Sequence, residues 1–236
     1  MSWGTPLRCA RAAPCASDCL RALAMVVAVG WAVTAAFAAR ADQAAGAALA
    51  RKGGSGIPAC MACHGANGEG QAAAGFPRLA GQNRDYLLKQ LKAFANGTRT
   101  SPQMAPIAGA LDAGQMRDAA AYYAGLPGWK QVEKPDMSSP PYQQGLKLAT
   151  VGDWSKEMPA CFACHGAGGE GIPPHFPALA GQPRTYTQAQ MQAWRSAKRT
   201  NDPQGLMQAV AAKMTDGEIA AVSVYFENPS NVGKEK

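Results

Sequence analysis

The sequence is poor in charge and in long apolar runs. Charged residues make up 17% of its 236 positions, and hydrophobic residues make up 47%. A disordered chain combines low hydrophobicity with high charge, so this composition excludes disorder. Glycine and proline together reach only about 18%, which excludes a low-complexity or collagen-like chain. Only residues 22–39 form an uncharged stretch long enough for a membrane span, which excludes a multi-span membrane protein. Basic residues are scattered, so nothing indicates binding to nucleic acid.

The first 41 residues are typical of a targeting segment. Arginines at positions 8, 11 and 21 precede or border the apolar run, which ends in the sequence Ala-Phe-Ala at 36–38. A positive n-region, an apolar h-region and an Ala-x-Ala site predict a signal peptide over residues 1–41, cleaved after position 38 or 41. The alternative is an uncleaved membrane anchor, because a run of about 18 residues reaches the lower limit for a span. Cleavage would remove three of the seven cysteines.

The remaining chain contains an internal repeat. The 13 residues from Pro58 return from Pro159, and 11 of the 13 positions are identical. The 25 residues from Phe76 return from Phe176, with 12 identities. Two copies of this length predict two domains rather than a solenoid, which needs shorter and more numerous units. The proline-rich segment 127–141 predicts a semi-rigid linker. The expected domains are therefore residues 42–126 and residues 142–236.

Each copy is predicted to be helical. Residues 85–96 place Leu88, Leu91 and Phe94 on one helical face, and residues 185–196 carry a weaker version of the pattern. Capping sequences at 112–115 and 215–218 predict the start of a last helix in each copy. No stretch alternates apolar and polar residues over a strand length. The expected fold class is all-α, with glycine-rich loops around the motifs that follow.

Both copies carry the sequence Cys-x-x-Cys-His, the attachment signature of c-type haem. Two cysteines three residues apart on a helical turn can reach the two vinyl groups of one porphyrin, and the histidine then projects toward the iron. A disulfide, a redox-active pair and structural zinc are the alternatives. No βαβ pattern surrounds the motifs, and each copy lacks the four ligands that zinc requires. The predicted haem-binding residues are Cys60, Cys63, His64, Cys161, Cys164 and His165.

The internal repeat also indicates the second axial ligand of each iron. Haem iron is commonly completed by His, Met, Cys or Tyr. His175 has Gly75 as its counterpart, so it cannot serve both copies and is interpreted as a surface residue. Most methionines align with leucine or isoleucine in the other copy and are interpreted as core residues. Met104 and Met207 match each other, so they are the predicted ligands.

Further recurring residues suggest how the site is supported. Pro77 and Pro177 follow the two histidines by 13 and 12 residues and could supply the carbonyl that a ligating histidine usually binds through its free ring N–H. Tyr86 and Tyr186 also recur, each with an arginine two residues earlier, Arg84 and Arg184. Contacts with the haem propionates and simple helix packing are both open interpretations of these residues.

With these motifs, the chain resembles the dihaem cytochromes of the cytochrome c4 family. The resemblance covers roughly residues 42–229 and rests on the paired Cys-x-x-Cys-His motifs, the two Phe-Pro-x-Leu-Ala-Gly-Gln segments and the methionine-to-capped-helix endings. It implies two tandem class I cytochrome c domains related by a pseudo-twofold axis, two covalently bound haem c groups, and a periplasmic location with possible peripheral membrane association. Three extra residues before Met207 depart from the first copy and alter the second distal loop.

The function that this resemblance implies is electron transfer rather than catalysis, because His and Met fill both axial positions of each iron. The expected donor is a quinol-oxidising complex of the cytochrome bc1 type or a dehydrogenase, and the expected acceptor is a terminal oxidase. The alternative is the electron-accepting cytochrome subunit of a flavoprotein or quinoprotein dehydrogenase. A dihaem peroxidase is disfavoured, since the chain is short for that class and each copy has a methionine that would block a peroxide site.

Overall fold

A computed structural model describes residue 1 and residues 43–131, 134–202 and 204–230. Both repeats lie in one unit of the chain, Asp42–Lys236. The predicted signal peptide and its alternative as an anchor lie outside the described residues. Within the described ranges, no helix is both long enough and apolar enough to cross a membrane.

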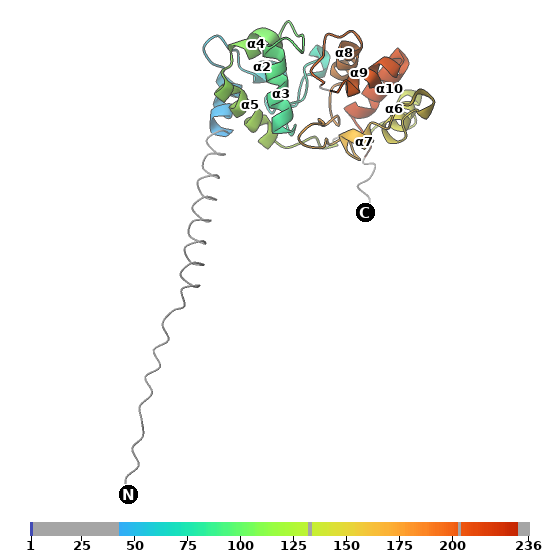
Figure 1. The fold of residues 1–236 in the computed structure, drawn as a ribbon, viewed down its shortest axis with the longest axis horizontal. Coiled ribbons are helices and arrows are strands. Elements are labelled where there is room, and N and C mark those ends of the chain that lie inside the picture. The colour runs from blue at the N-terminus through green and yellow to red at the C-terminus, as the bar shows by residue number, and fades with distance from the viewer. Residues whose placement is uncertain (2–42, 132–133, 203, 231–236) are drawn as a thin grey trace. The chain divides into compact units, whose positions relative to one another are not determined.

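Helices and short turns build both repeats (Figure 1), and the described residues pair only as isolated β-bridges, which confirms the all-α prediction. We refer to residues 43–126 as the first repeat and to residues 140–230 as the second. The first repeat contains a helix over 43–52, α2 (Met61–His64), η1 (Ala72–Ala74), α3 (Arg84–Ala95), α4 (Met104–Ala110) and α5 (Ala113–Gly125). The second contains α6 (Pro140–Thr150), η2 (Trp154–Lys156), α7 (Phe162–His165), α8 (Arg184–Arg195), α9 (Leu206–Lys213) and α10 (Asp216–Glu227).

In each repeat the first and last helices cross at a glycine. A Cβ atom on Gly46 would lie 2.0 Å from the carbonyl oxygen of Asp118 in α5. A Cβ atom on Gly145 in α6 would lie 2.3 Å from the carbonyl oxygen of Ala221 in α10. Only glycine therefore permits this close approach of two helix backbones. The first and last helices therefore pack against each other in the same way in both repeats.

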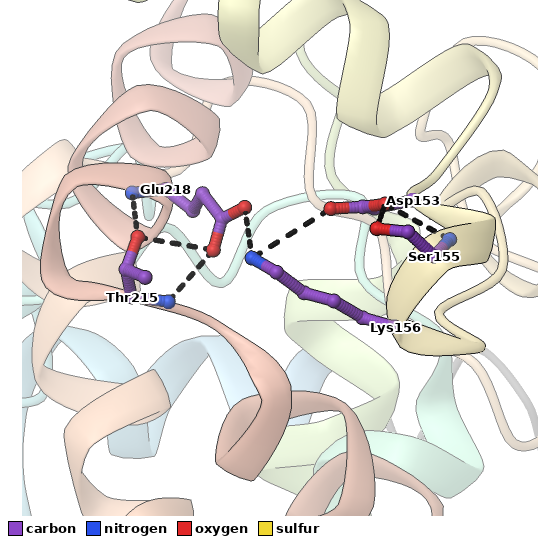
Figure 2. A network of polar contacts seen from close by, with 5 residues as sticks. All are labelled: Asp153, Ser155, Lys156, Thr215 and Glu218. Atoms are coloured by element: carbon purple, nitrogen blue, oxygen red, sulfur yellow. Dashed lines mark hydrogen bonds and ion pairs between the residues drawn. The ribbon is translucent and has the colours of Figure 1, made fainter.

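The predicted capping sequences start the last helices. Asp112 and Gln115 form a reciprocal capping box at α5, and Thr215 and Glu218 form one at α10. Figure 2 shows that the second box continues into a polar network, because Glu218 also accepts a 2.6 Å hydrogen bond from Lys156 of η2. This network ties the turn that precedes α7 to the start of α10. The buried residues of the two helices include Met116, Tyr123, Ile219 and Phe226.

Helix α3 buries a polar residue among its apolar ones. Its buried residues are Leu87, Gln90 and Ala93, and the predicted apolar residues Leu88, Leu91 and Phe94 are partly buried. The Gln90 side chain accepts hydrogen bonds from buried arginines of both repeats, so the helix turns a polar residue inward. Periodicity of apolar residues alone could not reveal this partner.

The two repeats contact each other through reciprocal interactions. Arg99 and Arg199 form an antiparallel β-bridge between the repeats. Thr100 and Thr200 each donate their backbone N–H to a carbonyl of the other repeat, both at 2.8 Å. In a twofold arrangement, a contact from the first repeat to the second is matched by the equivalent contact from the second repeat to the first. The predicted pseudo-twofold relation between the repeats therefore has a direct structural basis.

The recurring tyrosines belong to this contact. Arg199 donates to the hydroxyl of Tyr86 at 3.1 Å, and Arg99 donates to the hydroxyl of Tyr186 at 2.7 Å. Each tyrosine therefore serves as a polar partner for an arginine of the other repeat, which is more than helix packing alone. Arg184, by contrast, forms an ion pair with a glutamate of α10 in its own repeat.

Candidate functional site

Each Cys-x-x-Cys-His motif folds as one helical turn. Cys60 precedes α2 and Cys161 precedes α7, and both take helical backbone angles. The backbone N–H of the motif histidine donates to the carbonyl of that first cysteine at 2.9 Å in both repeats. Residues three apart lie on one face of a helix, so the turn presents both thiols of a motif in the same direction. This is the placement that two thioether bonds to one porphyrin require.

The chemistry of the thiols argues against the alternatives raised by the motif. All four motif cysteines are free thiols, so the structure does not contain the disulfide. Burial raises the pKa of Cys60, and it raises the pKa of Cys161 to about 12. Redox-active pairs need the opposite shift, because the thiolate is the reactive form. In the part of the chain that the structure describes, no three His, Cys, Asp or Glu residues are grouped as a metal site, so the zinc ligand set is not assembled.

Both motif histidines are buried and oriented by a proline carbonyl. The Nδ1 atom of His64 lies 3.0 Å from the carbonyl oxygen of Pro77, and that of His165 lies 2.8 Å from the carbonyl oxygen of Pro177. These bonds confirm the predicted role of the two prolines. They place the ring proton on Nδ1 and leave Nε2 as the lone-pair donor. Burial also lowers the pKa of each imidazole, which favours the neutral form that binds a metal.

The two predicted methionine ligands occupy matching places at the start of short helices. Met104 is the first residue of α4, and its backbone N–H donates to the hydroxyl of Ser101. Met207 is the second residue of α9, and its N–H donates to the carboxylate of Asp202. Both side chains are partly buried, and Met207 packs against the same apolar cluster as Cys161. Their role as iron ligands stays a prediction.

The other candidates behave as core or surface residues. The methionines interpreted as core residues are buried: Met116, Met158, Met191 and Met214. His175 is exposed, which confirms its interpretation as a surface residue. In the loop that the three additional residues lengthen, Gly205 takes a left-handed conformation with a φ angle of 64° directly before α9.

Four buried polar residues were not predicted from the sequence. Arg99 and Arg199 are 5% and 6% exposed, and Gln82 and Gln182 are 4% and 5% exposed. Each pair recurs at an offset of 100 residues, which is the signal that could have revealed them. The glutamines end the two Phe-Pro-x-Leu-Ala-Gly-Gln segments and bind backbone groups of the opposite repeat.

The donor set of each repeat fits haem c. Two free thiols on one face of a helical turn supply the atoms for thioether bonds. A buried neutral imidazole with a free Nε2 supplies one axial ligand, and its proton is already bound to a carbonyl. The same set is built twice, once in each repeat.

Comparison with known proteins agrees with this reading. The family model for cytochrome c matches residues 43–127 and 155–228. The thiosulfate dehydrogenase electron acceptor of Thiomonas intermedia (strain K12) is 42% identical over 206 residues, covering 87% of this chain and 88% of the relative. Cytochrome c4 of Pseudomonas aeruginosa is 38% identical over 191 residues, covering 80% of this chain and 89% of the relative.

Solved structures show the same likeness. Thiosulfate dehydrogenase from Marichromatium purpuratum, in its as-isolated form, superposes with a TM-score of 0.72 at 40% identity, covering 78% of this chain and 39% of that chain. Reduced recombinant cytochrome c4 from Pseudomonas stutzeri superposes with a TM-score of 0.65 at 36% identity, covering 72% of this chain and 92% of that chain.

Proposed function

The chain belongs to the cytochrome c family as a protein with two class I cytochrome domains and two covalently bound haem c groups, and we propose that each iron is held by one histidine and one methionine. The first haem would bind Cys60 and Cys63, with His64 and Met104 as axial ligands. The corresponding residues of the second site are Cys161, Cys164, His165 and Met207. When bound, the haem iron accepts and returns one electron.

The protein is an electron carrier rather than an enzyme, as its relatives' electron-transfer roles indicate. With His and Met at both axial positions, neither iron has a place for a substrate. The orientation of His64 and His165 by proline carbonyls is the observation that carries this proposal. A fixed, hydrogen-bonded imidazole needs little rearrangement when the iron changes oxidation state, which suits repeated one-electron transfer.

We place the carrier in a periplasmic respiratory chain, in peripheral association with the membrane. The arginine-bordered apolar segment over residues 1–41 supports export. In this scheme the donor is a quinol-oxidising complex of the cytochrome bc1 type or a dehydrogenase, and the acceptor is a terminal oxidase.

A specific observation favours a dehydrogenase as donor. Two relatives named as thiosulfate dehydrogenase electron acceptors are 42% and 43% identical to this chain, whereas relatives named cytochrome c4 are 35–40% identical. The second candidate function is therefore the electron-accepting partner of a dehydrogenase that oxidises a sulfur oxyanion.

A reduction assay separates the two donors. The oxidised holoprotein is mixed with a thiosulfate dehydrogenase plus thiosulfate, or with a bc1-type complex plus quinol, and haem reduction is followed by absorbance. Rapid reduction by thiosulfate dehydrogenase alone supports the acceptor role, and rapid reduction by the quinol-oxidising complex alone supports the respiratory role. Failure of both donors, for a protein that chemical reductants reduce fully, would contradict the proposed partners.

A further inference from the structure

The peptide group between Pro77 and Arg78 has hydrogen bonds on both sides. Its carbonyl oxygen binds Nδ1 of His64 at 3.0 Å. Its N–H donates to Oε1 of Gln182 at 3.1 Å, and Nε2 of Gln182 donates to the next carbonyl, that of Arg78, at 2.9 Å. One amide thus connects a motif histidine of the first repeat to a glutamine of the second.

The second repeat has the same arrangement in reverse. The peptide group between Pro177 and Ala178 binds Nδ1 of His165 through its carbonyl at 2.8 Å. Its N–H donates to Oε1 of Gln82 at 3.0 Å, and Nε2 of Gln82 donates to the carbonyl of Ala178 at 2.7 Å. The connection is therefore crossed: each glutamine binds the peptide that orients the histidine of the other repeat.

Burial strengthens these hydrogen bonds. Gln82 and Gln182 are 4% and 5% exposed, and His64 and His165 are 7% and 6% exposed. Hydrogen bonds in series polarise one another, an effect estimated at roughly 10–30% per bond, and a low local dielectric strengthens each of them. An amide whose N–H is donated to a glutamine oxygen carries more negative charge on its carbonyl oxygen. That carbonyl then binds the imidazole N–H more strongly, and the imidazole becomes a better electron donor through Nε2.

We propose that Gln182 and Gln82 are positioning residues that set the reduction potential of the haem in the opposite repeat. This inference rests on the proposed function, in which His64 and His165 are iron ligands. A more electron-donating imidazole stabilises the oxidised iron, so each glutamine lowers the potential of the haem across the interface. The repeats are thereby coupled: separating them would raise both potentials together, because both glutamines would leave their peptides.

The competing explanation is that the glutamines only hold the repeats together. The chain offers a control for it, since the hydroxyl of Thr185 donates to the carbonyl of Ala72 across the same interface at 2.8 Å. That bond joins the repeats without touching the peptide of a motif histidine. Loss of the Thr185 bond therefore tests the effect of a weakened interface alone.

The test is a redox titration of the two-haem protein in which the signals of each haem are followed separately by NMR, assigned through their contacts with the attached cysteines. Gln182→Met keeps the length of the side chain and removes its polar atoms. We expect it to change the reduction equilibrium of the first haem about threefold in favour of the reduced form, a rise of about 28 mV for one electron. The second haem should stay within a few mV, Gln82→Met should give the converse result, and Thr185→Val should move neither.

A second readout is the Nδ1 proton signal of each ligating histidine in the reduced protein. We expect Gln182→Met to shift the signal of His64 and not that of His165. Equal shifts of both haems in every variant, or a shift of the haem in the glutamine's own repeat, would overturn the inference. If the methionine variants fail to retain both haems, Gln182→Asn and Gln82→Asn withdraw the amide by one methylene group and should give the same crossed pattern. Histidine signals absent from the wild type would contradict the proposed ligation itself, whereas signals present but unmoved would contradict only this inference.

Discussion

Arg99 and Arg199 face each other between the repeats as an antiparallel bridge pair, and both guanidinium groups are buried. Each lies over an aromatic ring of its own repeat, 4.5 Å from the centroid of Phe94 and 4.2 Å from that of Trp194. Their hydrogen bonds go to glutamine, tyrosine and asparagine oxygens. Burial, together with the nearby positive charge of Arg99, lowers the pKa of Arg199. The interface thus holds two arginines through side-chain oxygens and aromatic rings.

Removing one of these arginines should destabilise the protein measurably. Arg199→Met removes the donor to the buried hydroxyl of Tyr86 and one of the donors to the side chain of Gln90, which keeps its bond from Arg99. An unsatisfied buried polar group costs about 1–3 kcal/mol, so we expect the free energy of unfolding to fall by about that amount. Chemical denaturation of the holoprotein measures it. Lys147→Met, at an exposed position of α6, is the control and should change the value by less than about 0.5 kcal/mol. Equal effects would show that the buried interface contributes nothing specific.

The axial methionines can be tested through the sulfur-to-iron charge-transfer band of the oxidised protein. Met104→Ala and Met207→Ala should each remove about half of the band, because each removes one of two thioether ligands. Met116→Ala and Met191→Ala serve as controls, since both residues are buried in the core and should leave the band intact. Loss of the band in the controls and its retention in the first two variants would reverse the assignment.

The network in Figure 2 predicts a dependence of stability on acid. Burial raises the pKa of Glu218, but the hydrogen bonds from Lys156 and Thr215 outweigh it and hold that pKa below its ordinary value. A carboxylate whose pKa is lowered by folding stabilises the folded state at any pH above the pKa that the group has in the unfolded chain. This stability is lost as the pH falls through the pKa of the folded state. We therefore expect the thermal midpoint of the wild type to fall as the pH drops below about 4.3, the ordinary value for Glu.

Lys156→Met removes this contribution together with the longer ion pair, at 3.6 Å, between Lys156 and Asp153. Without the donor from Lys156, the pKa of Glu218 returns toward its ordinary value, so the variant should be less stable than the wild type at pH 7 and the difference should shrink in acid. Thermal denaturation between pH 7 and pH 3 provides the comparison, with Lys147→Met as the matched loss of one exposed lysine. A difference from the wild type that stays constant with pH would mean that the ion pair does not control the titration of Glu218.

Charge is distributed unevenly between the repeats, and this predicts how partners dock. Residues 42–135 carry ten basic and six acidic residues, whereas residues 136–236 carry nine of each. On the first repeat, Lys89 and Lys92 line a surface groove. Encounters between redox proteins are oriented by complementary fields, so an acidic partner should engage the first repeat. We expect Lys89→Glu and Lys92→Glu to lower the rate of electron transfer with that partner and to flatten its dependence on ionic strength.

Lys147→Glu makes the same charge change on the second repeat and should have a smaller effect on that partner. Stopped-flow rates across a series of salt concentrations give the slopes. If all three variants share the slope of the wild type, the lysines serve only solubility.

The sequence predicted the parts of the site whose causes are local. The Cys-x-x-Cys-His turns and the capping boxes each depend on residues within one helical turn. Each of these sequence patterns also occurs in both repeats, which made the predictions firmer. The proline carbonyls were also predictable, because they recur at nearly equal distances from His64 and His165. The polar contacts between the repeats were not predictable, since the hydrogen-bond partners of Gln82 and Arg99 in the other repeat lie about a hundred residues away in the sequence. A glutamine at the end of a loop segment reads as a surface residue until the opposite repeat supplies the buried peptide that it binds.

The central claim, that this chain carries electrons on two haems, is tested most directly by counting electrons in a reductive titration of the purified holoprotein. We expect two electrons per chain for the wild type, and one electron per chain when Cys60 and Cys63 are both replaced by alanine so that the first haem is lost. An uptake of one electron by the wild type, or of none, would contradict it.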